Sequence, residues 1–508
     1  MKMIINGQKV DSSDKKTQDV INPATLEKID TVPSATAEDV KKAVDGAVAA
    51  QEAWAALPVR ERCIILRRFA DMVMERRLEL GEILAKEAGK PYMKEAVWEL
   101  DSVAYVYRGA CDVALHYYGA TMPIGTEPGY DDDLQITIHE PLGTLACIIP
   151  YNFPPAIWAF KTAAALAAGN TIVVKAPSFD PMTLLVLHEM LHEAGVPAGV
   201  AQCLTGKGAL VGDLLVDDPR IASVNFTGST EAGISIAQTA AKHLTEYKFE
   251  LGGNDAFIVF DDADMDLVIK EAEDQARNNR QCCTGSKRFI VHNSLKEEFV
   301  KRLSAELDKL VIGDPMDPKV NMGPMIAERA AKKVEEQVNH TVEQGAKIAH
   351  GGKRNGAFYD PTILVDVTPD MDIAKDMEVF GPVWPVIGFD TVDEAVAIAN
   401  GSQYGLGGGL FSRNIYTCLQ TAKRLKTGHI AINGSGNFRA AELPFGGGKK
   451  MSGNSRESLS KVMDEVTQIK SIVFRYAFNE KKKTSQYRQQ VGGNSHAYEY
   501  ERPSEGRQ

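Results

Sequence analysis

The sequence predicts an α/β protein of two lobes, and three observations support this fold class. Its 508 residues exceed what one ordinary hydrophobic core organises, so two or more domains or lobes are expected. After Pro141, short apolar runs alternate with helical stretches, a rhythm that favours parallel α/β structure. A second set of the same alternation begins near Ala256, which indicates a second α/β lobe.

The N-terminal part of the chain is predicted to be mainly helical. Thr36 can cap a helix whose first turn holds Asp39, and helical character continues to about Ala114. Residues 134–139 then alternate between apolar and polar side chains, which predicts a strand. The apolar residues on one face of the first helix are Val40, Ala43, Val44 and Ala47.

Both α/β segments are predicted to consist of alternating strands and helices. The expected elements of the first set are strand 145–149, helix 156–168, strand 171–174, helix 182–194 and strand 223–226. Those of the second set are strand 256–260, helix 267–277, strand 289–291 and helix 295–310. Residues 469–474 predict one more strand, which can pair with the segment around Ile136.

Composition and charge exclude several classes of protein. The hydrophobic fraction of 44% and charged fraction of 25% are typical of a folded soluble protein, and the net charge of -11 argues against nucleic-acid binding. No stretch reaches the roughly 18 uncharged apolar residues of a membrane span, and the N-terminus carries no long apolar signal segment. We therefore expect a cytoplasmic protein with no membrane partner. Residues 479–508 predict a polar tail or surface arm.

The seven cysteines form neither a CxxC metal pattern nor an evident disulfide framework, so no metal site is expected. In a reducing compartment, most of them should be packing residues. Cys282 and Cys283 are adjacent at the end of a predicted helix and immediately before a strand, a position that can present a thiol to a cleft. Taken alone, such a pair is more typical of buried structural cysteines.

Other segments place useful chemical groups at turns. Glu250 ends a strand before two glycines, where a general base can be exposed, and Asn152 lies in a proline-bounded turn where its amide can hold a developing oxyanion. Residues 228–233 follow a strand and open a helix whose amides can receive a pyrophosphate, although the middle glycine of the dinucleotide fingerprint is absent. Residues 378–382 and 444–449 are further glycine-containing turns. Taken singly, each segment is typical of an ordinary turn.

Together and in this order, the segments resemble the aldehyde dehydrogenase superfamily, from near the N-terminus to about Phe474. The matching residues are Pro150–Pro154, Val174 with Lys175, Phe226–Ser229, Glu250–Gly253, Gln281–Cys283, Glu378–Pro382, Pro444–Gly447, Ser452 with Gly453, and Arg456 with Glu457.

The resemblance implies a covalent oxidation of an aldehyde. Cys283 is then the nucleophile and Cys282 its non-essential neighbour. The thiolate attacks the aldehyde, and the oxyanion of the thiohemiacetal is held by the Asn152 amide and the Cys283 backbone N–H. After hydride transfer to a nicotinamide, Glu250 deprotonates the water that hydrolyses the thioester to a carboxylic acid.

Two further site residues and one departure follow from the resemblance. Lys161 and Glu457 match positions proposed to pass a proton away from Glu250, and a buried structural ion pair is the alternative. Arg280 stands where family members usually have glycine, which can alter the wall of the cleft.

The resemblance also implies a coenzyme, NADP or NAD. NAD-preferring relatives often carry glutamate where this chain has Ser178, and the neutral hydroxyl removes the repulsion of a 2'-phosphate, so NADP should be accepted. The implied coenzyme-binding residues are Tyr151, Lys175, Ser178, Gly228, Ser229, Leu251, Glu378 and Phe380. Of these, Lys175 falls at the adenosine ribose, Gly228 and Ser229 at the pyrophosphate, and Glu378 and Phe380 at the nicotinamide ribose.

The aldehyde itself is less clearly indicated. Arg439 lies in the loop 433–439, where relatives line the aldehyde pocket, and it can bind a carboxylate, phosphate or sulfonate; a solvated or intersubunit arginine is the alternative. One rival function is an acylating dehydrogenase that passes the thioester to coenzyme A, against which Glu250 argues. The other is a non-catalytic binding or structural protein, against which the presence of Cys283, Glu250 and Asn152 argues.

The architecture implied by the resemblance has three parts and a tail. A Rossmann-like NAD(P)-binding domain comprises residues 1–120 and 142–251, and an α/β catalytic domain comprises residues 252–451. A small β bridging and oligomerisation region comprises residues 121–141 and 452–478, before the polar tail 479–508. The chain is then expected to self-associate as a dimer or a tetramer.

Overall fold

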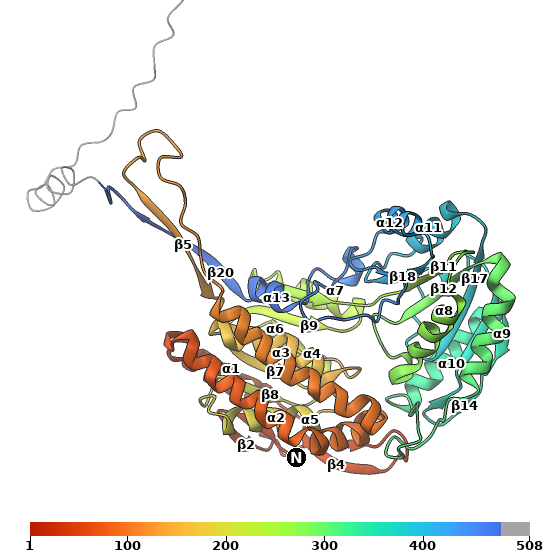
Figure 1. The fold of residues 1–508 in the computed structure, drawn as a ribbon. Coiled ribbons are helices and arrows are strands. Elements are labelled where there is room, and N and C mark those ends of the chain that lie inside the picture. Colours follow the sequence, from red (N-terminus) through yellow and green to blue (C-terminus); the bar gives the residue numbers. More distant parts are fainter. Residues whose placement is uncertain (479–508) are drawn as a thin grey trace, which may run out of the picture. The chain divides into compact units, whose positions relative to one another are not determined.

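The computed structural model describes residues 1–478, and most of them form one compact unit (Figure 1). This unit comprises Met1–His116 and Pro141–Thr467, and among the described residues Tyr117–Glu140 and 468–478 belong to a second unit. Among the described residues, no helix is both long and apolar enough to cross a membrane. The predicted tail 479–508 lies outside the described residues.

The first lobe of the large unit is built on a seven-stranded sheet with the order β10-β9-β6-β7-β8-β1-β2. Strands β10 to β8 run parallel, and β1 is antiparallel to β8. The strands are β1 Met3–Ile5, β2 Gln8–Val10, β6 Thr144–Ile148, β7 Thr171–Lys175, β8 Ala201–Leu204, β9 Ile221–Thr227 and β10 Glu246–Glu250.

Helices cover both faces of this sheet because successive strand residues point to opposite sides. Ala146 and Ile148 of β6 pack with α1, α6 and α7, whereas the thiol of Cys147 approaches the carbonyl of Lys161 on α4. Outside α4 and α5, the long helices α2 and α3 lie side by side (Figure 1). The helices are α1 Ala37–Ala56, α2 Val59–Ala88, η1 Tyr92–Ala96, α3 Val97–Leu115, α4 Pro154–Ala168, α5 Met182–Glu193, α6 Gly208–Val216 and α7 Thr230–Ala240.

The second lobe repeats this design with the strand order β13-β16-β17-β12-β11-β18-β19, parallel except for the antiparallel pair β13 and β16. Helices α8 and α9 pack on one face, and α10, α11 and α12 pack on the other. The strands are β11 Asp255–Val259, β12 Ser286–His292, β13 Lys347–His350, β16 Thr362–Val367, β17 Val383–Phe389, β18 Gly408–Phe411 and β19 Ala431–Ile432. The helices are α8 Met265–Glu273, α9 Lys296–Leu307, α10 Glu328–Glu343, α11 Val392–Asn400 and α12 Ile415–Arg424.

The remaining elements are short strand pairs and one helix. β3 (Thr17–Ile21) pairs with β4 (Lys28–Pro33), β14 (Arg354–Asn355) pairs with β15 (Phe358–Tyr359), and α13 (Leu459–Glu465) packs on α3 and α4. In the second unit, β5 (Leu134–Pro141) runs beside β20 (Thr467–Phe474), as predicted for the segment around Ile136 (Figure 1).

The α/β class and the cap of the first helix are confirmed. The Thr36 side chain accepts from the Asp39 amide in a capping box. The helix predicted over 267–277 is wrong in its second half, because α8 ends at Glu273 and a distorted 3-10 segment, η2 (Asp274–Arg280), follows. The cysteine pair therefore follows an irregular loop and not a helix. The domain limits drawn from the sequence stay a prediction.

Candidate active site

The site begins at the carboxyl edge of the first sheet, where parallel α/β folds bind their ligands. Lys175 ends β7 and Glu250 ends β10, while Asn152 follows β6 and Ser229 follows β9. Four of the residues predicted from motifs are thus brought to one sheet edge by strand order alone.

The second lobe supplies the facing wall from the amino ends of its strands. Cys283 lies just before β12, and Glu378 lies just before β17. The Gly253 amide donates to Glu378 Oε1 at 3.2 Å, and a Cβ added at Gly253 would lie 2.7 Å from the Cys283 carbonyl oxygen. The turn after Glu250, the cysteine loop and the Glu378 segment therefore meet at close quarters.

The loop before the cysteines is held in an unusual backbone conformation. Asn278, Asn279 and Arg280 all have left-handed φ values, of 50°, 51° and 55°. Asparagine tolerates this region, whereas arginine adopts it at a cost. The Asn278 amide group donates to the Asn152 carbonyl at 2.7 Å, and its backbone N–H donates to buried Glu95 at 2.9 Å. These bonds fix the loop against the Asn152 turn.

Arg280 is buried below the cysteine loop. Its guanidinium lies 4.3 Å from the Trp384 ring centroid, and the Nε and Nη1 atoms have no hydrogen-bond partner among the described residues. Burial lowers its pKa to about 9. The left-handed backbone at this position explains the glycine that relatives usually carry there.

The two thiols are adjacent in the chain and influence one another's pKa. Interaction with the Cys282 thiol, followed by burial, raises the pKa of the Cys283 thiol well above its usual value, and the Lys287 ammonium opposes both effects. The Cys282 sulfur lies 3.0 Å from the Thr284 hydroxyl and 3.5 Å from the Asn437 side-chain oxygen. Cys282 is therefore anchored by neighbouring polar groups.

Glu250 is a buried carboxyl group with unused hydrogen-bonding capacity. Neither of its side-chain oxygens has a partner among residues 1–478. Burial raises its pKa well above the usual value, with repulsion from Glu457 next, while Lys161 and Arg439 act in the opposite direction. A Cβ at Gly446 would lie 2.9 Å from Glu250 Oε1, so glycine leaves room for the carboxyl group.

Glu457 joins two cations beside Glu250. Lys161 Nζ lies 3.3 Å from one Glu457 oxygen, with both side chains buried, and Arg439 lies 3.4 Å from the other. The Arg439 guanidinium also lies 4.0 Å from the Phe445 ring centroid. Arg439 is therefore already engaged by a carboxylate and an aromatic ring.

At the end of β7, the middle strand of the first sheet, Lys175 and Ser178 form a polar pair. Lys175 Nζ donates to Ser178 Oγ at 3.0 Å, and that hydroxyl donates to the Gly206 carbonyl at 3.1 Å. Burial lowers the Lys175 pKa to about 8. Ser229 caps α7 by accepting from the Ala232 amide at 3.3 Å, directly after Gly228.

The remaining residues implied for the coenzyme lie around the same edge. The rings of Tyr151 and Phe380 meet edge to face, with centroids 6.1 Å apart. Leu251 packs so closely on α7 that a Cβ at Gly233 would lie 2.7 Å from its side chain. Lys287 Nζ lies 3.2 Å from Glu378 Oε1.

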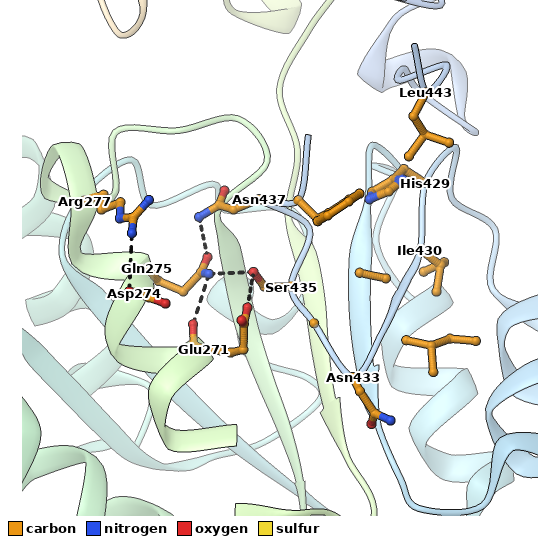
Figure 2. Close-up of a pocket in the computed structure, with 14 residues that line it drawn as sticks. Glu271, Asp274, Gln275, Arg277, His429, Ile430, Asn433, Ser435, Asn437 and Leu443 are labelled. Carbon is orange, nitrogen blue, oxygen red and sulfur yellow. Dashed lines mark hydrogen bonds and ion pairs between the residues drawn. The ribbon is translucent and has the colours of Figure 1, made fainter. Parts of the chain in front are cut away.

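A cavity of about 540 Å³ is lined by the end of α8, by η2 and by residues of the segment 429–443 (Figure 2). Hydrogen bonds join Gln275 to Ser435 at 2.9 Å and Asn437 to Gln275 at 2.9 Å along one wall. Arg277 also lines the cavity; its side chain is 68% exposed and its ion pair with Asp274 spans 3.6 Å. Asn437 contacts Cys282, the chain neighbour of Cys283, so this wall of the cavity adjoins the loop that carries the nucleophile.

Arg277, Asn278 and Lys287 lie at the site but were not predicted from the sequence. The pair Asn278–Asn279 was a usable signal, because asparagine is enriched in left-handed loops. Arg277 and Lys287 carry no such signal, since exposed arginines and isolated lysines are common in any chain.

Comparison with known proteins identifies the family. Residues 9–472 match the model of the aldehyde dehydrogenase family. The chain is 37% identical to succinate-semialdehyde dehydrogenase [NADP(+)] GabD of Escherichia coli, covering 92% of this chain and 96% of that protein. It is 36% identical to 3-sulfolactaldehyde dehydrogenase of Priestia aryabhattai, covering 93% and 97%. The NAD+ complex of an aldehyde dehydrogenase from Bacillus cereus superposes with a TM-score of 0.90 at 36% identity, covering 94% of this chain and 96% of that one.

The matched range contains nearly all of both lobes and every residue described above for the site. Similarity in sequence and in fold thus extends over nearly the whole chain, and this chain belongs to the aldehyde dehydrogenase family.

Proposed function

We propose that this enzyme oxidises an aldehyde bearing a second, anionic group to the corresponding carboxylic acid, with NADP+ or NAD+ as hydride acceptor. The observation that carries the proposal is the approach of the Cys283 loop to both the Asn152 turn and the turn after Glu250. A nucleophile, an oxyanion donor and a base are the three groups that a hydrolytic aldehyde oxidation needs.

The first step is addition to the aldehyde of the Cys283 thiolate, which forms when the thiol loses its proton to solvent. The Cys283 sulfur bonds to the carbonyl carbon, and the π electrons move to the carbonyl oxygen. The negative charge on that oxygen is stabilised by the Asn152 side-chain amide and the Cys283 backbone N–H. The hydrogen bond from the Asn278 side chain to the Asn152 carbonyl holds the Asn152 turn against the loop before Cys283. It therefore keeps the Asn152 amide and the Cys283 N–H close to one another.

Residues at the edge of the first sheet, together with Glu378 from the second lobe, fit a dinucleotide. Buried Lys175 with Ser178 suits a ribose that carries hydroxyl groups or a 2'-phosphate, the start of α7 at Gly228 and Ser229 suits a pyrophosphate, and Glu378 suits a second ribose. When bound, the nicotinamide supplies the hydride acceptor for oxidation of the thiohemiacetal to a thioester.

Hydrolysis then restores the thiol. Glu250 removes a proton from water as the water oxygen adds to the thioester carbon, and the carbon–sulfur bond breaks to release the acid. The raised pKa of Glu250, caused first by its burial, makes it a strong base once deprotonated. We assign Lys161 and Glu457 to the charge balance that lets this proton leave.

Arg277 is the better placed of two arginines to bind the anionic end of the substrate. It lines the cavity and keeps most of its side chain exposed, whereas Arg439, the residue chosen from the sequence, is paired with Glu457. The named relatives act on succinate semialdehyde and 3-sulfolactaldehyde, which carry a carboxylate and a sulfonate. Arginine binds both groups through its planar fork. Arg439 stays the second candidate.

A substrate panel tests the proposal. Succinic semialdehyde, 3-sulfolactaldehyde, glyceraldehyde 3-phosphate, hexanal and benzaldehyde are compared, each with NADP+ and with NAD+, and products are identified by mass spectrometry. We expect an anionic aldehyde to have the highest kcat/KM, a carboxylic acid as product, and no turnover by Cys283→Ser. Equal rates on neutral aldehydes that survive Arg277→Ala and Arg439→Ala would refute anion recognition. An acyl-CoA product formed in the presence of coenzyme A would refute hydrolysis.

A further inference from the structure

Lys287 is a buried ammonium group that the reaction described above does not use. It is the second residue of β12 and is 4% exposed. Burying a charged side chain is costly unless it is paired and fully hydrogen-bonded. The surroundings of Lys287 therefore call for a specific explanation.

Three acceptors surround the Lys287 ammonium, matching its three N–H donors. Nζ donates to the Cys282 carbonyl at 2.8 Å and to the Cys283 carbonyl at 2.9 Å, and it lies 3.2 Å from Glu378 Oε1. The Gly285 carbonyl is a more distant neighbour at 3.4 Å. With its donors used in this way, Lys287 acts on the protein itself rather than as a direct ligand of substrate.

The hydrogen bond from Lys287 to the Cys282 carbonyl sets the direction of the Cys283 N–H, the backbone donor proposed for the oxyanion. That carbonyl and the Cys283 N–H belong to one peptide group, which is planar and trans, so they point in opposite directions. Holding the carbonyl on Lys287 directs the Cys283 N–H away from Lys287. A cation on a carbonyl oxygen also polarises the amide and strengthens its N–H as a donor.

The third contact connects the same ammonium to the proposed coenzyme site. Glu378 accepts from Lys287 and from the Gly253 amide, and the Phe380 ring centroid lies 5.7 Å from the ammonium. Lys287 therefore bridges the backbone of the nucleophile loop and the carboxylate expected at the nicotinamide ribose.

We propose that Lys287 is a positioning residue that orients the Cys282–Cys283 peptide for oxyanion binding and links that peptide to Glu378. The roles of the Cys283 N–H and of Glu378 rest on the proposed function. Coenzyme bound at Glu378 and the geometry of the nucleophile loop are then coupled through one ammonium group.

The same charge acts on the thiol pair. Lys287 favours the thiolate form of both Cys282 and Cys283, while Glu250 disfavours that of Cys283. The Lys287 ammonium also faces Asp255 and lowers the pKa of that carboxyl group, although burial raises the same pKa by more. Removing Lys287 therefore leaves the cysteines near the carboxyl groups of Glu250 and Asp255 without this ammonium to stabilise their thiolate forms.

The test uses Lys287→Met, which keeps the aliphatic length and removes the charge, and Lys287→Gln, which keeps a neutral donor. Two readouts are measured on the full-length enzyme: kcat and KM for aldehyde and coenzyme, and the pH dependence of iodoacetamide alkylation at Cys283, followed by peptide mass spectrometry. We expect kcat to fall at least about tenfold, with KM for the aldehyde changing much less, because a transition-state interaction is weakened. The alkylation midpoint should rise by on the order of one pH unit in both variants.

Lys449→Met is the matched control. Lys449 also donates to two backbone carbonyls of the second lobe, those of Asn400 and Ser402, and neither bond involves a cysteine or Glu378. It should lower thermal stability without moving the alkylation profile. Because alkylation needs no aldehyde, an enzyme inactive on every substrate would refute the proposed function and leave this test intact.

A purely structural role for Lys287 would give a different pattern. Lys287→Met would then lose stability, as judged by thermal unfolding, yet keep the wild-type kcat and alkylation profile, and that result would overturn the proposal. A rise in coenzyme KM alone would overturn it as well. If Lys287→Met does not fold, Lys287→Gln carries the same two readouts.

Discussion

Ser178 donates to the Gly206 carbonyl and accepts from Lys175, so a small neutral side chain faces the proposed adenosine ribose. Ser178→Glu should shift preference from NADP+ toward NAD+. Two like charges about 4 Å apart repel by about 4 kcal/mol at an effective dielectric constant of 20, so a loss of at least about tenfold in kcat/KM for NADP+ is expected. Steady-state kinetics with both coenzymes measure the ratio, and an unchanged ratio would place the 2'-position elsewhere.

Glu250 offers a second test at the residue scale. Glu250→Gln removes the base but preserves shape, so thioester formation should continue while hydrolysis slows by about 100-fold or more. A burst of one NAD(P)H per active subunit, followed by a slow steady state, is the expected signature in stopped-flow absorbance. A wild-type steady-state rate in this variant would remove Glu250 from the mechanism.

The pH dependence of hydrolysis follows from the same residue. Burial, followed by repulsion from Glu457, raises the pKa of Glu250, so at a given pH more of this carboxyl group is protonated than of an exposed glutamate. Only its deprotonated form accepts a proton from water. In the wild-type enzyme, single-turnover hydrolysis should therefore accelerate as pH rises, and the acceleration should be absent in Glu250→Gln. A rate that is flat or falls with rising pH would contradict this assignment.

At the scale of elements, regular structure was predictable from the sequence and the η2 loop was not. Apolar periodicity located β6, α4, β7 and α5 to within a few residues. The same periodicity carried the helix predicted over 267–277 past Glu273, because nothing in the pattern marks the left-handed turn from Asn278 to Arg280. Hydrogen bonds that Asn278 donates to the Glu95 carboxylate and to the Asn152 carbonyl hold that turn, and both acceptors lie more than a hundred residues away in the chain.

The pair β5 and β20 lies in the region for which the sequence predicts self-association. Ile469 and Val473 lie on one face of β20 and are 67% and 51% exposed, an unusual position for branched apolar side chains. We propose that this strand pair is an interface between copies of the chain. Ile469→Lys combined with Val473→Glu should reduce the solution mass measured by light scattering, while Gln468→Glu, on the opposite face, should not. An unchanged mass in the double variant would exclude this surface.

At the scale of the whole molecule, the candidate active site joins residues at the carboxyl edge of one sheet to residues at the amino edge of the other. The motifs predicted Cys283, Glu250 and Asn152, because each stands at a recognisable turn. They did not predict Lys287, whose contacts depend on how the turn at Gly253, the cysteine loop and Glu378 meet. Strand order can be read from a sequence in part, whereas the docking of two lobes depends on side-chain packing between distant segments.

Stability should fall as pH rises, because several carboxyl groups are buried far from solvent. Burial raises the pKa of Glu87, Glu95 and Asp255 to about 7 in each case. A folded-state pKa above the unfolded value contributes stability at low pH, and that contribution is lost as pH rises through about 7. His188, whose pKa burial lowers to about 3, is neutral in the folded state throughout this range.

Urea unfolding between pH 5 and 7, above the unfolded and up to the folded pKa values of these groups, measures this loss. In that window each raised carboxyl group lowers the free energy of unfolding with a slope approaching about 1.4 kcal/mol per pH unit, and above pH 7 its slope fades. Glu87→Gln keeps an acceptor for the Met182 and Thr183 amides and cannot ionise, so it should make the pH dependence shallower. Glu193→Gln, an exposed carboxylate near Arg76, should leave it unchanged. If Glu87→Gln has the same pH dependence as the wild-type enzyme, Glu87 is already ionised in the folded state, and the loss of stability must come from Glu95 and Asp255.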